Sequence, residues 1–325
     1  MTKRAAVIGA GMTGLACARV LRRAGFYVEV FEKDRIIGGR MATVRASMTT
    51  FDHGSQYVTA RSSQFRDYLQ ELAGTGYVAP WAPRAMIGEQ GEGQVNNWFV
   101  GTPGMSAMVR PLAESVRIHT NRSVHTIGKM NDSWHLWFDD ETSAGPFAAI
   151  AITVPAPQAQ YLLGPLDELA EPLSRVRMAP CWALMVKLDV PVLPEQDVYS
   201  DMSEVIRWVA RNNTKPGRAS RTGETVVIHA SQGYSRETED APPEEIAEEL
   251  WAEVSHVLDL PEVRPTYMAA HLWKHGLVDQ SLGESYIFSS EHNVGIAGDW
   301  CSGRLAEHAF QSGQALGRAI VSSLD

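Results

Sequence analysis

Apolar residues recur along the chain with the periods of strands and helices. RAAVIG (4–9) is a short apolar run, residues 12–24 have apolar positions at helical spacing, and Gly25 ends that helix before YVEVFE (27–32). This order of strand, turn, helix and strand predicts a βαβ unit. FAAIAITVPAP (147–157) is a continuous apolar run closed by prolines, which is typical of a strand buried on both faces. We therefore expect it to join the same parallel sheet.

Two other segments alternate apolar and polar residues, a pattern typical of strands with one solvated face. They are VRIHTNRSVHTIGKM (116–130) and SWHLWFDDE (133–141), and the turn-forming residues 131–133 lie around their junction. We expect these two segments to form a meander.

The pattern changes between residues 166 and 284, where prolines interrupt the chain and CWALMVKLDV (181–190) and ETVVIHAS (224–231) resemble strands. One helix opens at Pro242-Pro243. Its apolar stripe consists of Ile246, Leu250, Val254, Val257 and Leu258. Its glutamates lie off this stripe and crowd the first turn, which predicts a solvated face and not a metal site: Glu244, Glu245, Glu248 and Glu249.

Residues 285–325 return to the first pattern, with the strand NVGIAGD followed by a helix. One face of that helix carries Ala306, Ala309, Phe310, Gly313, Leu316 and Ile320. The sequence therefore predicts an α/β protein in which the dinucleotide-binding domain is discontinuous. We assign residues 1–65, 97–165 and 285–325 to this domain, and residues 66–96 and 166–284 to a substrate domain.

Charge and cysteine content narrow the class of protein. The net charge is −9, with acidic and basic residues intermixed, so we expect neither nucleic acid nor a membrane surface as a partner. The cysteines Cys17, Cys181 and Cys301 are far apart and odd in number, which favours a reducing, cytoplasmic compartment. We expect no signal peptide and no membrane span.

The first candidate site is the GxGxxG turn formed by Gly9, Gly11 and Gly14. It follows a strand and opens a helix, where glycines permit a tight turn and a close approach of backbone to pyrophosphate. Glu32 ends the second strand, where a carboxylate can accept hydrogen bonds from the ribose hydroxyls of adenosine. An ordinary glycine turn is the alternative, but the pairing with Glu32 favours dinucleotide binding.

Two later segments favour FAD over NAD. Gly38-Gly39-Arg40 lets the chain pass close to the cofactor and supplies an arginine for the pyrophosphate. Gly298-Asp299 ends a late strand and leads to a helix that begins near residues 304–307. Its carboxylate can accept from a ribityl hydroxyl, and the helix N-terminus can stabilise negative charge at the flavin N1/O2 edge. An NAD enzyme has no need of this second return to the first domain.

With these segments, FDHGSQYVTA (51–60) and RWVARNNTKPGR (207–218) make the chain resemble the renalase branch of the flavin amine oxidase superfamily, particularly bacterial renalases. VIGAGMTGLACARVLRRAG, GGRMAT, WFVGTPGMSAMVRPLAE, ITVPAPQAQ and IAGDWC extend the resemblance from the first strand to the last helix. The glycine motifs are shared by many flavoenzymes, whereas Gln56-Tyr57 and residues 208–216 indicate renalase more narrowly.

The resemblance implies a glutathione-reductase-like, Rossmann-type FAD-binding domain joined to a mixed-sheet α+β substrate domain. It implies non-covalent FAD bound by Gly9, Gly11, Met12, Thr13, Gly14, Glu32, Lys33, Gly39, Arg40, Met41, Gln56, Tyr57, Val124, Asp299, His308, Ala309 and Phe310. The implied reaction is oxidation of the 1,2- and 1,6-dihydro isomers of NAD(P) to NAD(P)⁺. Hydride would pass to flavin N5, and O₂ would reoxidise the flavin to give H₂O₂. We expect a monomer or weak dimer that repairs these metabolites.

Hydride transfer from a dihydropyridine needs stacking more than acid–base groups, so no catalytic residue is assigned. Candidates for the substrate cavity are Tyr57, Trp208, Asn212, His229, Trp273 and Trp300, since aromatic walls suit a planar ring. Core packing is the alternative for most of them. We expect no metal, because the histidines lack ligand spacing.

A flavin amine oxidase acting on a small amine is the nearest alternative. Amine oxidases often place a lysine near flavin N5, and here we expect Ala183 or Leu184 at the corresponding position, with Lys187 facing away from Leu184. No cysteine attachment site for covalent flavin is apparent, although Cys301 lies near the Asp299 turn. A non-catalytic FAD redox sensor and a redox-neutral mutase are further alternatives.

Overall fold

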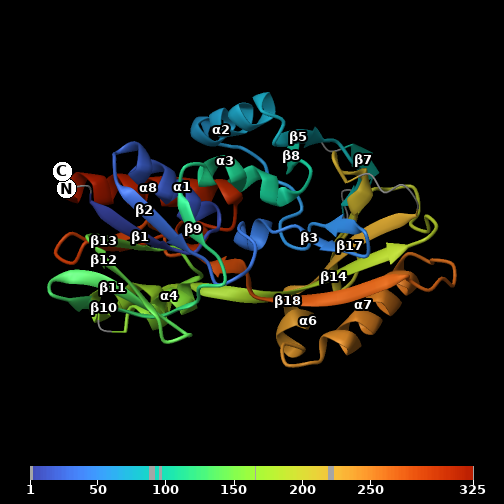
Figure 1. The fold of residues 1–325 in the computed structure, drawn as a ribbon. Coiled ribbons are helices and arrows are strands. Elements are labelled where there is room, and N and C mark those ends of the chain that lie inside the picture. Colours follow the sequence, from blue (N-terminus) through green and yellow to red (C-terminus); the bar gives the residue numbers. More distant parts are fainter. Residues whose placement is uncertain (1–2, 88–91, 95–96, 165, 219–222, 325) are drawn as a thin grey trace.

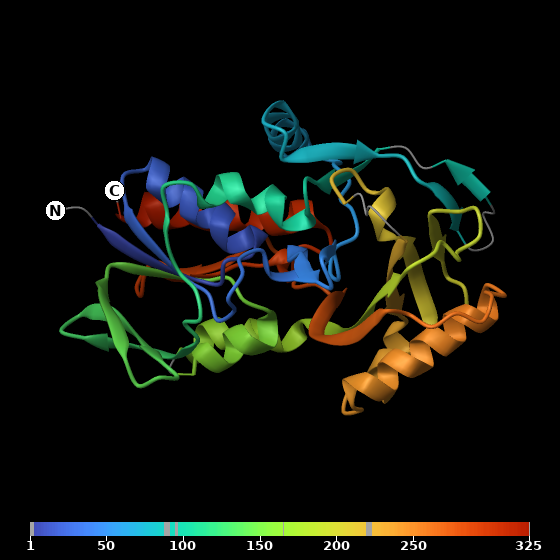
Figure 2. The same ribbon diagram turned by 45° about the vertical axis from the view of Figure 1, so that its right-hand side comes forward.

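Two β-sheets dominate the computed structural model, which describes residues 3–87, 92–94, 97–164, 166–218 and 223–324 (Figure 1). A six-stranded sheet lies near both termini, at the left of Figure 1, and a seven-stranded sheet lies at the right. The long strands β14 (Arg177–Leu188) and β18 (Tyr267–Gln280) run from the middle of the molecule into the second sheet. The turned view in Figure 2 shows the same two halves side by side.

The six-stranded sheet grows from the predicted βαβ unit. Its strand order is β19-β20-β13-β1-β2-β9, and the pairs from β20 to β9 are parallel, while β19 is antiparallel to β20. The strands are β1 (Arg4–Ile8), β2 (Tyr27–Phe31), β9 (Arg117–His119), β13 (Ala149–Ile152), β19 (Ile287–Ser289) and β20 (Val294–Ile296). The apolar run at 147–157 thus joins the parallel sheet next to β1, as predicted.

Helices α1 (Met12–Arg23) and α8 (Ala306–Leu324) pack together on one face of this sheet (Figure 1). A Cβ added to Gly313 would lie 2.0 Å from the carbonyl oxygen of Thr13, so only a glycine permits this approach of the two helices. The buried side of α8 includes the stripe predicted from the sequence. The packing places the first turn of α1 against the middle of α8, at Gly313.

The meander prediction is partly wrong. β10 (Val124–Met130), β11 (Ser133–Phe138) and β12 (Ser143–Phe147) form a separate antiparallel sheet, whereas residues 117–119 pair in parallel with β2 as strand β9. Asn121 adopts a left-handed backbone with φ of 53°, which breaks the strand between β9 and β10. Residues 119–123 are all polar, so the alternation is interrupted at this break, which the prediction of one continuous segment overlooked.

The seven-stranded sheet is mixed, with the order β18-β14-β17-β16-β15-β6-β7. β15 and β6 are parallel and the other neighbouring pairs are antiparallel. Its shorter strands are β6 (Arg84–Ile87), β7 (Glu92–Gln94), β15 (Val198–Ser200), β16 (Ile206–Arg211) and β17 (Glu224–Ala230).

Helices α6 (Gln232–Glu237) and α7 (Pro243–Val257) cover one face of this second sheet (Figure 1). Ile246, Leu250 and Val254 are buried against the sheet as predicted, together with Trp251, while the predicted acidic face of α7 is exposed.

The remaining elements are short and connect or flank the two sheets. They are α2 (Ser63–Gly74), α3 (Arg110–Ala113), α4 (Ala156–Leu162), α5 (Asp167–Ala170), β3 (Val44–Ala46), β4 (Thr49–Phe51), β5 (Val78–Trp81) and β8 (Trp98–Gly101). Single 3₁₀ turns occur at Gly39–Met41, Met105–Val109, Glu171–Arg175, Asn212–Thr214 and Asp299–Cys301. Within the described ranges, none of the helices combines the length and the apolar character that crossing a bilayer requires.

The strands of the two sheets come from the chain ranges that we assigned to the two domains. The six-stranded sheet draws on 1–65, 97–165 and 285–325, and the seven-stranded sheet draws on 66–96 and 166–284. Helix α2 crosses the domain boundary at residue 65. It packs against α8, where Phe65 and Tyr68 contact Phe310. We retain the division as a proposal, with α2 grouped with the first domain.

Candidate functional site

A cleft of about 1630 Å³ lies where the two sheets meet. Four of its lining residues follow the carboxyl ends of parallel strands: Gly9 after β1, Glu32 after β2, Thr153 after β13 and Asp299 after β20. This edge of a parallel sheet is where open α/β folds bind ligands. Residues of β16, β17 and β18 line the opposite side. The volume exceeds that of a pocket for one drug-sized ligand, so it can hold a dinucleotide and a second molecule.

In the glycine turn, a side chain would meet open space at Gly11 but would clash with the backbone at Gly14. A Cβ on Gly14 would lie 2.0 Å from the carbonyl oxygen of Gly9, so this glycine serves helix-to-strand packing. A Cβ on Gly11 would meet no atom within 4 Å, and Gly11 lines the cleft. No side chain caps α1 among the described residues, so its first N–H groups are available to an anion. The turn therefore has the open space and the free donors that binding of a phosphate group requires.

Glu32 lies at the rim of this turn with its carboxylate buried. One oxygen, Oε2, accepts from the backbone N–H of Ala10 at 2.8 Å, and Oε1 accepts from that of Asp34 at 3.0 Å. Burial raises the pKa of Glu32, and the two backbone hydrogen bonds oppose that rise. Each oxygen keeps a second lone pair, so the carboxylate can still accept ribose hydroxyls.

Arg40 and Asp299, predicted to bind the pyrophosphate and the ribityl chain of the cofactor, contact each other. The Arg40 Nη2 atom lies 2.6 Å from Asp299 Oδ1, and its Nη1 donates to the carbonyl of Gly276 at 3.3 Å. The arginine follows Gly38 and Gly39, whose positive φ values of 117° and 54° turn the chain toward Gly11. Both charged groups line the cleft, so one ion pair joins the first and last segments of the site.

Aromatic side chains form one wall of the cleft. Tyr57 stacks on Trp98 with ring centroids 3.7 Å apart and an interplanar angle of 11°. Trp208 lies 5.6 Å from Tyr57 and 5.7 Å from Trp98 by ring centroids. All three line the cleft, which gives it a flat apolar surface suited to a planar ring.

The face of the second sheet contributes a row of side chains across four strands. Trp208 on β16 pairs with His229 on β17, His229 pairs with Ala183 on β14, and Ala183 pairs with His271 on β18. Residues directly paired between strands share one face, so Trp208, His229 and His271 face the same side, with the small Ala183 between the histidines. The strand register thus builds this wall.

Three histidines of the cleft, His53, His229 and His271, are neutral at physiological pH. Burial lowers the pKa of His53 to about 3, and the neighbouring His271 and His229 lower it further. Burial also lowers the pKa of His229 to about 4 and shifts the pKa of His271 downward. His53 lies 4.8 Å from Trp273 and 5.0 Å from His271 by ring centroids. The three imidazole rings are therefore polar but uncharged.

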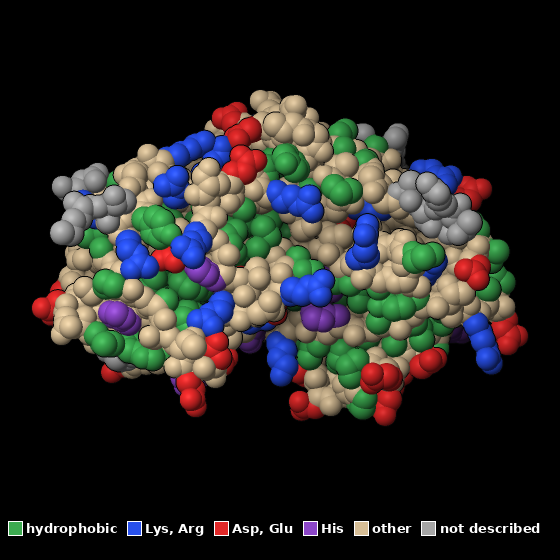
Figure 3. All heavy atoms as spheres, in the orientation of Figure 1, with side chains coloured by type: hydrophobic (Ala, Val, Ile, Leu, Met, Phe, Trp, Pro, Cys, Tyr) green, Lys and Arg blue, Asp and Glu red, His purple; other side chains and the backbone are tan. Residues whose placement is uncertain are grey.

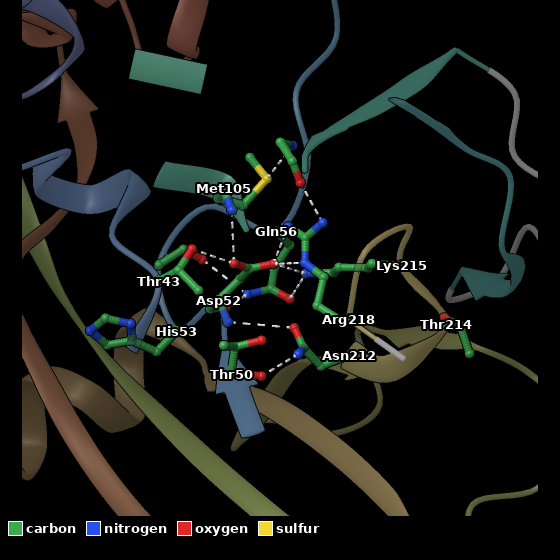
Figure 4. Close-up of polar contacts among 12 residues, drawn as sticks. Thr43, Thr50, Asp52, His53, Gln56, Met105, Asn212, Thr214, Lys215 and Arg218 are labelled. Carbon is green, nitrogen blue, oxygen red and sulfur yellow. Dashed lines mark hydrogen bonds and ion pairs between the residues drawn. The ribbon is translucent and has the colours of Figure 1, made fainter. Parts of the chain in front are cut away.

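A buried ion cluster contacts Gln56 (Figure 4). Asp52 accepts from Arg218 through Nη2 at 2.6 Å and Nε at 2.9 Å, and Lys215 Nζ lies 3.5 Å from the same Oδ2 atom. The side chains of all three are at most 1% exposed. Arg218 also donates to the carbonyl oxygens of Gly101 and Pro216. The cluster ties the loop after β16 to the loop after β4.

The cluster contains one acidic side chain, Asp52, and two basic side chains, Lys215 and Arg218. Burial acts to raise the pKa of Asp52, but the charges of Lys215 and Arg218 outweigh it and leave that pKa below its usual value. Burial lowers the pKa of Lys215 to about 8, with Arg218 lowering it further and Asp52 opposing. One carboxylate therefore balances two cations.

Most of the residues predicted from the sequence line the cleft, but four do not. Gly14, Asn212, His308 and Phe310 are absent from its lining among the described residues. Asn212 bonds to backbone on both sides, since Nδ2 donates to Thr50 O at 2.8 Å and Oδ1 accepts from Asp52 N at 3.4 Å. Phe310 stacks on Tyr68 with centroids 4.6 Å apart. Trp300 lines the cleft although its Nε1 is bonded to Val154 O at 3.1 Å.

The register of β14 refines the expectation for Lys187. Ala183, rather than Leu184, faces the side of His229, and Lys187 shares that side because it lies four residues further along. Four residues correspond to roughly 13 Å along a strand. There Lys187 Nζ donates to the carbonyl of Ser47 at 3.1 Å, so it lies outside the cleft. Cys301 is buried, and burial raises the pKa of its thiol to about 12.

Several site residues were not predicted from the sequence. His53, Trp98 and His271 line the cleft, and Lys215 and Arg218 support it from behind. Asp52 and His53 lie in the segment 51–60, and Lys215 and Arg218 lie in the segment 207–218. Both segments carry the family resemblance, and that was the available signal.

Two family models match the chain. A model described as an NAD(P)-binding Rossmann-like domain matches residues 7–72, and one described as flavin containing amine oxidoreductase matches residues 85–321. Among curated proteins, renalase of Mus musculus is 26% identical over 302 residues, which cover 86% of this chain and 87% of that protein. Protoporphyrinogen oxidase 2 of Arabidopsis thaliana is 37% identical over 70 residues, or 22% of this chain and 14% of that protein.

The fold is also similar to solved structures. Cyclohexylamine oxidase from Brevibacterium oxydans IH-35A superposes with a TM-score of 0.76 at 13% sequence identity, and the match covers 100% of both chains. At this identity the likeness concerns the fold alone.

Proposed function

Because the chain belongs to the flavin-containing amine oxidoreductase family, we propose that it is a renalase-type oxidase. Its substrates would be the 1,2- and 1,6-dihydro isomers of NAD(P). In the overall reaction, a dihydro isomer, O₂ and a proton give NAD(P)⁺ and H₂O₂. The similarity to mouse renalase over most of both chains supports this choice within the family.

FAD is the cofactor of this family, and the residues present fit it. The open cradle at Gly11 and the free N–H groups of α1 suit a pyrophosphate, while Glu32 suits the adenosine ribose. We propose that Arg40 binds the pyrophosphate and that Asp299 binds the ribityl chain. When bound, FAD supplies the hydride acceptor and the site that reduces O₂.

The role of the protein in the proposed reaction is to position the substrate ring. Tyr57, Trp98 and Trp208 would hold the dihydropyridine flat, and the row formed by His229 and His271 would limit its position along the sheet. Aromatisation to the pyridinium provides the driving force, so a general base is not required. In this mechanism the side chains mainly align the dihydropyridine ring within the cleft.

The observation that carries the proposal is the uncharged, aromatic wall of the cleft. His53 and His229 are held neutral by burial, and the flat surface of Tyr57 and Trp208 lies beside them. Basic residues at the cleft lining could meet the substrate phosphates: Lys33, Arg35, Arg122, Arg207, Lys274 and Arg304. Basic side chains gather across the middle of the face in Figure 3, whereas the lower right edge is more acidic.

The proposal is tested by mixing the purified holoprotein, without oxygen, with isomerised dihydronicotinamide dinucleotides, authentic NADH or a panel of small amines. Flavin absorbance reports reduction. We expect rapid bleaching with the isomers and slow or no bleaching with NADH and amines. Comparable bleaching by an amine would support the amine oxidase alternative instead. No bleaching by any donor would support the redox sensor.

A further inference from the structure

The segment 207–218, which supports the family resemblance, also contains a buried lysine with a chemical role. Lys215 lies in this motif, buried at 2% exposure, and its Nζ donates to Gln56 Oε1 at 3.0 Å. An ammonium group can only donate hydrogen bonds. The oxygen of the Gln56 amide must therefore face Lys215, and the nitrogen must face the other way.

The nitrogen of Gln56 has both of its hydrogens committed to backbone. Nε2 lies 2.5 Å from the carbonyl oxygen of Asp52 and 3.0 Å from that of Gly54. His229 Nε2 is 3.5 Å from this nitrogen, and it lies 3.1 Å from the carbonyl oxygen of His53. Because Gln56 has no hydrogen left to donate and a carbonyl can only accept, His229 must carry its own hydrogen on Nε2.

This hydrogen leaves Nδ1 of His229 with a lone pair. Burial holds the pKa of the ring at about 4, so Nδ1 stays unprotonated at neutral pH. His229 lines the cleft next to Trp208, and no partner for Nδ1 occurs among the described residues. Nδ1 is also not one of the fully buried atoms that lack a partner there, so its free side is at the cleft. The Nδ1 atom of His229 is thus a neutral hydrogen-bond acceptor on this wall, beside the flat aromatic surface.

We propose that His229 is a specificity-determining residue, whose Nδ1 accepts a hydrogen bond from the carboxamide N–H of the dihydronicotinamide ring. The carbonyl oxygen of His53, 3.1 Å from Nε2, holds the imidazole in this tautomer, and Lys215 fixes the orientation of the Gln56 amide beside it. This inference rests on the proposed function. It predicts that the protein recognises the amide and rejects the corresponding carboxylic acid, which has no hydrogen to donate at neutral pH and would place its lone pairs against that of Nδ1.

Binding to the oxidised holoprotein tests this directly, with NAD⁺ and its nicotinic acid counterpart as probes and the flavin absorption spectrum as the signal. We expect the wild type to bind the amide at least about 10-fold more tightly, the effect of one hydrogen bond. His229→Phe should bind both probes equally, while His229→Gln, which restores an acceptor oxygen, should recover a preference. His256→Phe, at an exposed histidine of α7 that does not line the cleft, is the control and should keep the full preference.

The tautomer gives a readout that is independent of turnover. In ¹⁵N NMR of histidine-labelled holoprotein, we expect His229 as the neutral Nε2–H form. Lys215→Met should leave this tautomer unchanged, because the carbonyl oxygen of His53 still accepts from Nε2. Lys215→Met leaves Asp52 paired with Arg218, so the ion pair behind the site persists.

An Nδ1–H tautomer in the wild type, or an unchanged preference in His229→Phe, would overturn the inference. These results differ from failure of the proposed function, in which the dihydro isomers do not reduce the flavin at all. Flavin content and circular dichroism show whether each variant has folded, and if His229→Phe does not fold, the His229→Gln result and the ¹⁵N NMR of the wild type decide.

Discussion

Asp52→Asn removes the one negative charge from a cluster that buries two cations. The side chain of Asp52 is fully buried, and its Oδ2 atom contacts both Arg218 and Lys215. Asparagine has nearly the same volume and can still accept from Thr43 and from the backbone N–H of Met105 at Oδ1. Packing should therefore change little, and the main loss is electrostatic.

The magnitude follows from the burial of the partners. Removing one member of a buried ion pair costs about 3–5 kcal/mol, because the remaining charge is left uncompensated in a poorly polarisable surrounding. Here Lys215 and Arg218 would both remain, so we expect a loss of at least 3 kcal/mol. That is a large part of the roughly 5–15 kcal/mol that stabilises a typical domain.

The assay is urea unfolding of the wild type and the variant, followed by circular dichroism at pH 7. Glu71→Gln is the matched control, because it removes the same charge from an exposed ion pair with Arg19. That change should cost about 0–1 kcal/mol. A loss in Asp52→Asn no larger than in Glu71→Gln would refute the argument that the cluster depends on this carboxylate.

A double variant tests the cause of the loss. Asp52→Asn combined with Lys215→Met leaves only Arg218 uncompensated in the cluster, so it should be more stable than Asp52→Asn alone. If the two losses simply add, charge imbalance is not the source of the destabilisation.

Three further predictions concern cofactor binding and acid stability. Arg40→Ala should lower FAD retention after dialysis, whereas Arg45→Ala, which alters an exposed residue of β3, should not; equal flavin content would place Arg40 away from the phosphates. Gly11→Ala should lose FAD without loss of apoprotein stability in urea, while Gly14→Ala should unfold more readily; destabilisation by both would show that Gly11 is needed for packing. The pKa of His229 is about 4 in the folded protein, against about 6.5 for an unperturbed histidine. The unfolded chain therefore binds more protons between these values, and the free energy of unfolding should fall as the pH drops through this window. His229→Gln should flatten this slope by about 1.4 kcal/mol per pH unit, and unchanged urea midpoints from pH 7 to pH 5 would contradict it.

Local patterns in the sequence were enough for the dinucleotide half of the site. The glycine turn, Glu32 and the late Asp299 were identifiable because each depends on neighbours within a few residues: a strand end, a tight turn and a helix start. The discontinuous sheet could be predicted for the same reason, since its strands carry the continuous apolar runs of a parallel sheet. The error at β9 arose at residues 119–123, a polar run around the left-handed residue Asn121 that separates strands of two different sheets.

Only the tertiary structure decided which side chains meet on the substrate side. Asp52 and Arg218 are 166 positions apart, and no local pattern indicates that they form an ion pair. The row of Trp208, His229, Ala183 and His271 depends on the register of four strands, and a shift of one residue would turn these side chains to the opposite face. The amino-acid sequence by itself thus determined the cofactor, because dinucleotide recognition relies on local backbone geometry. The shape and polarity of the substrate wall required the fold, because long-range pairing and burial set them.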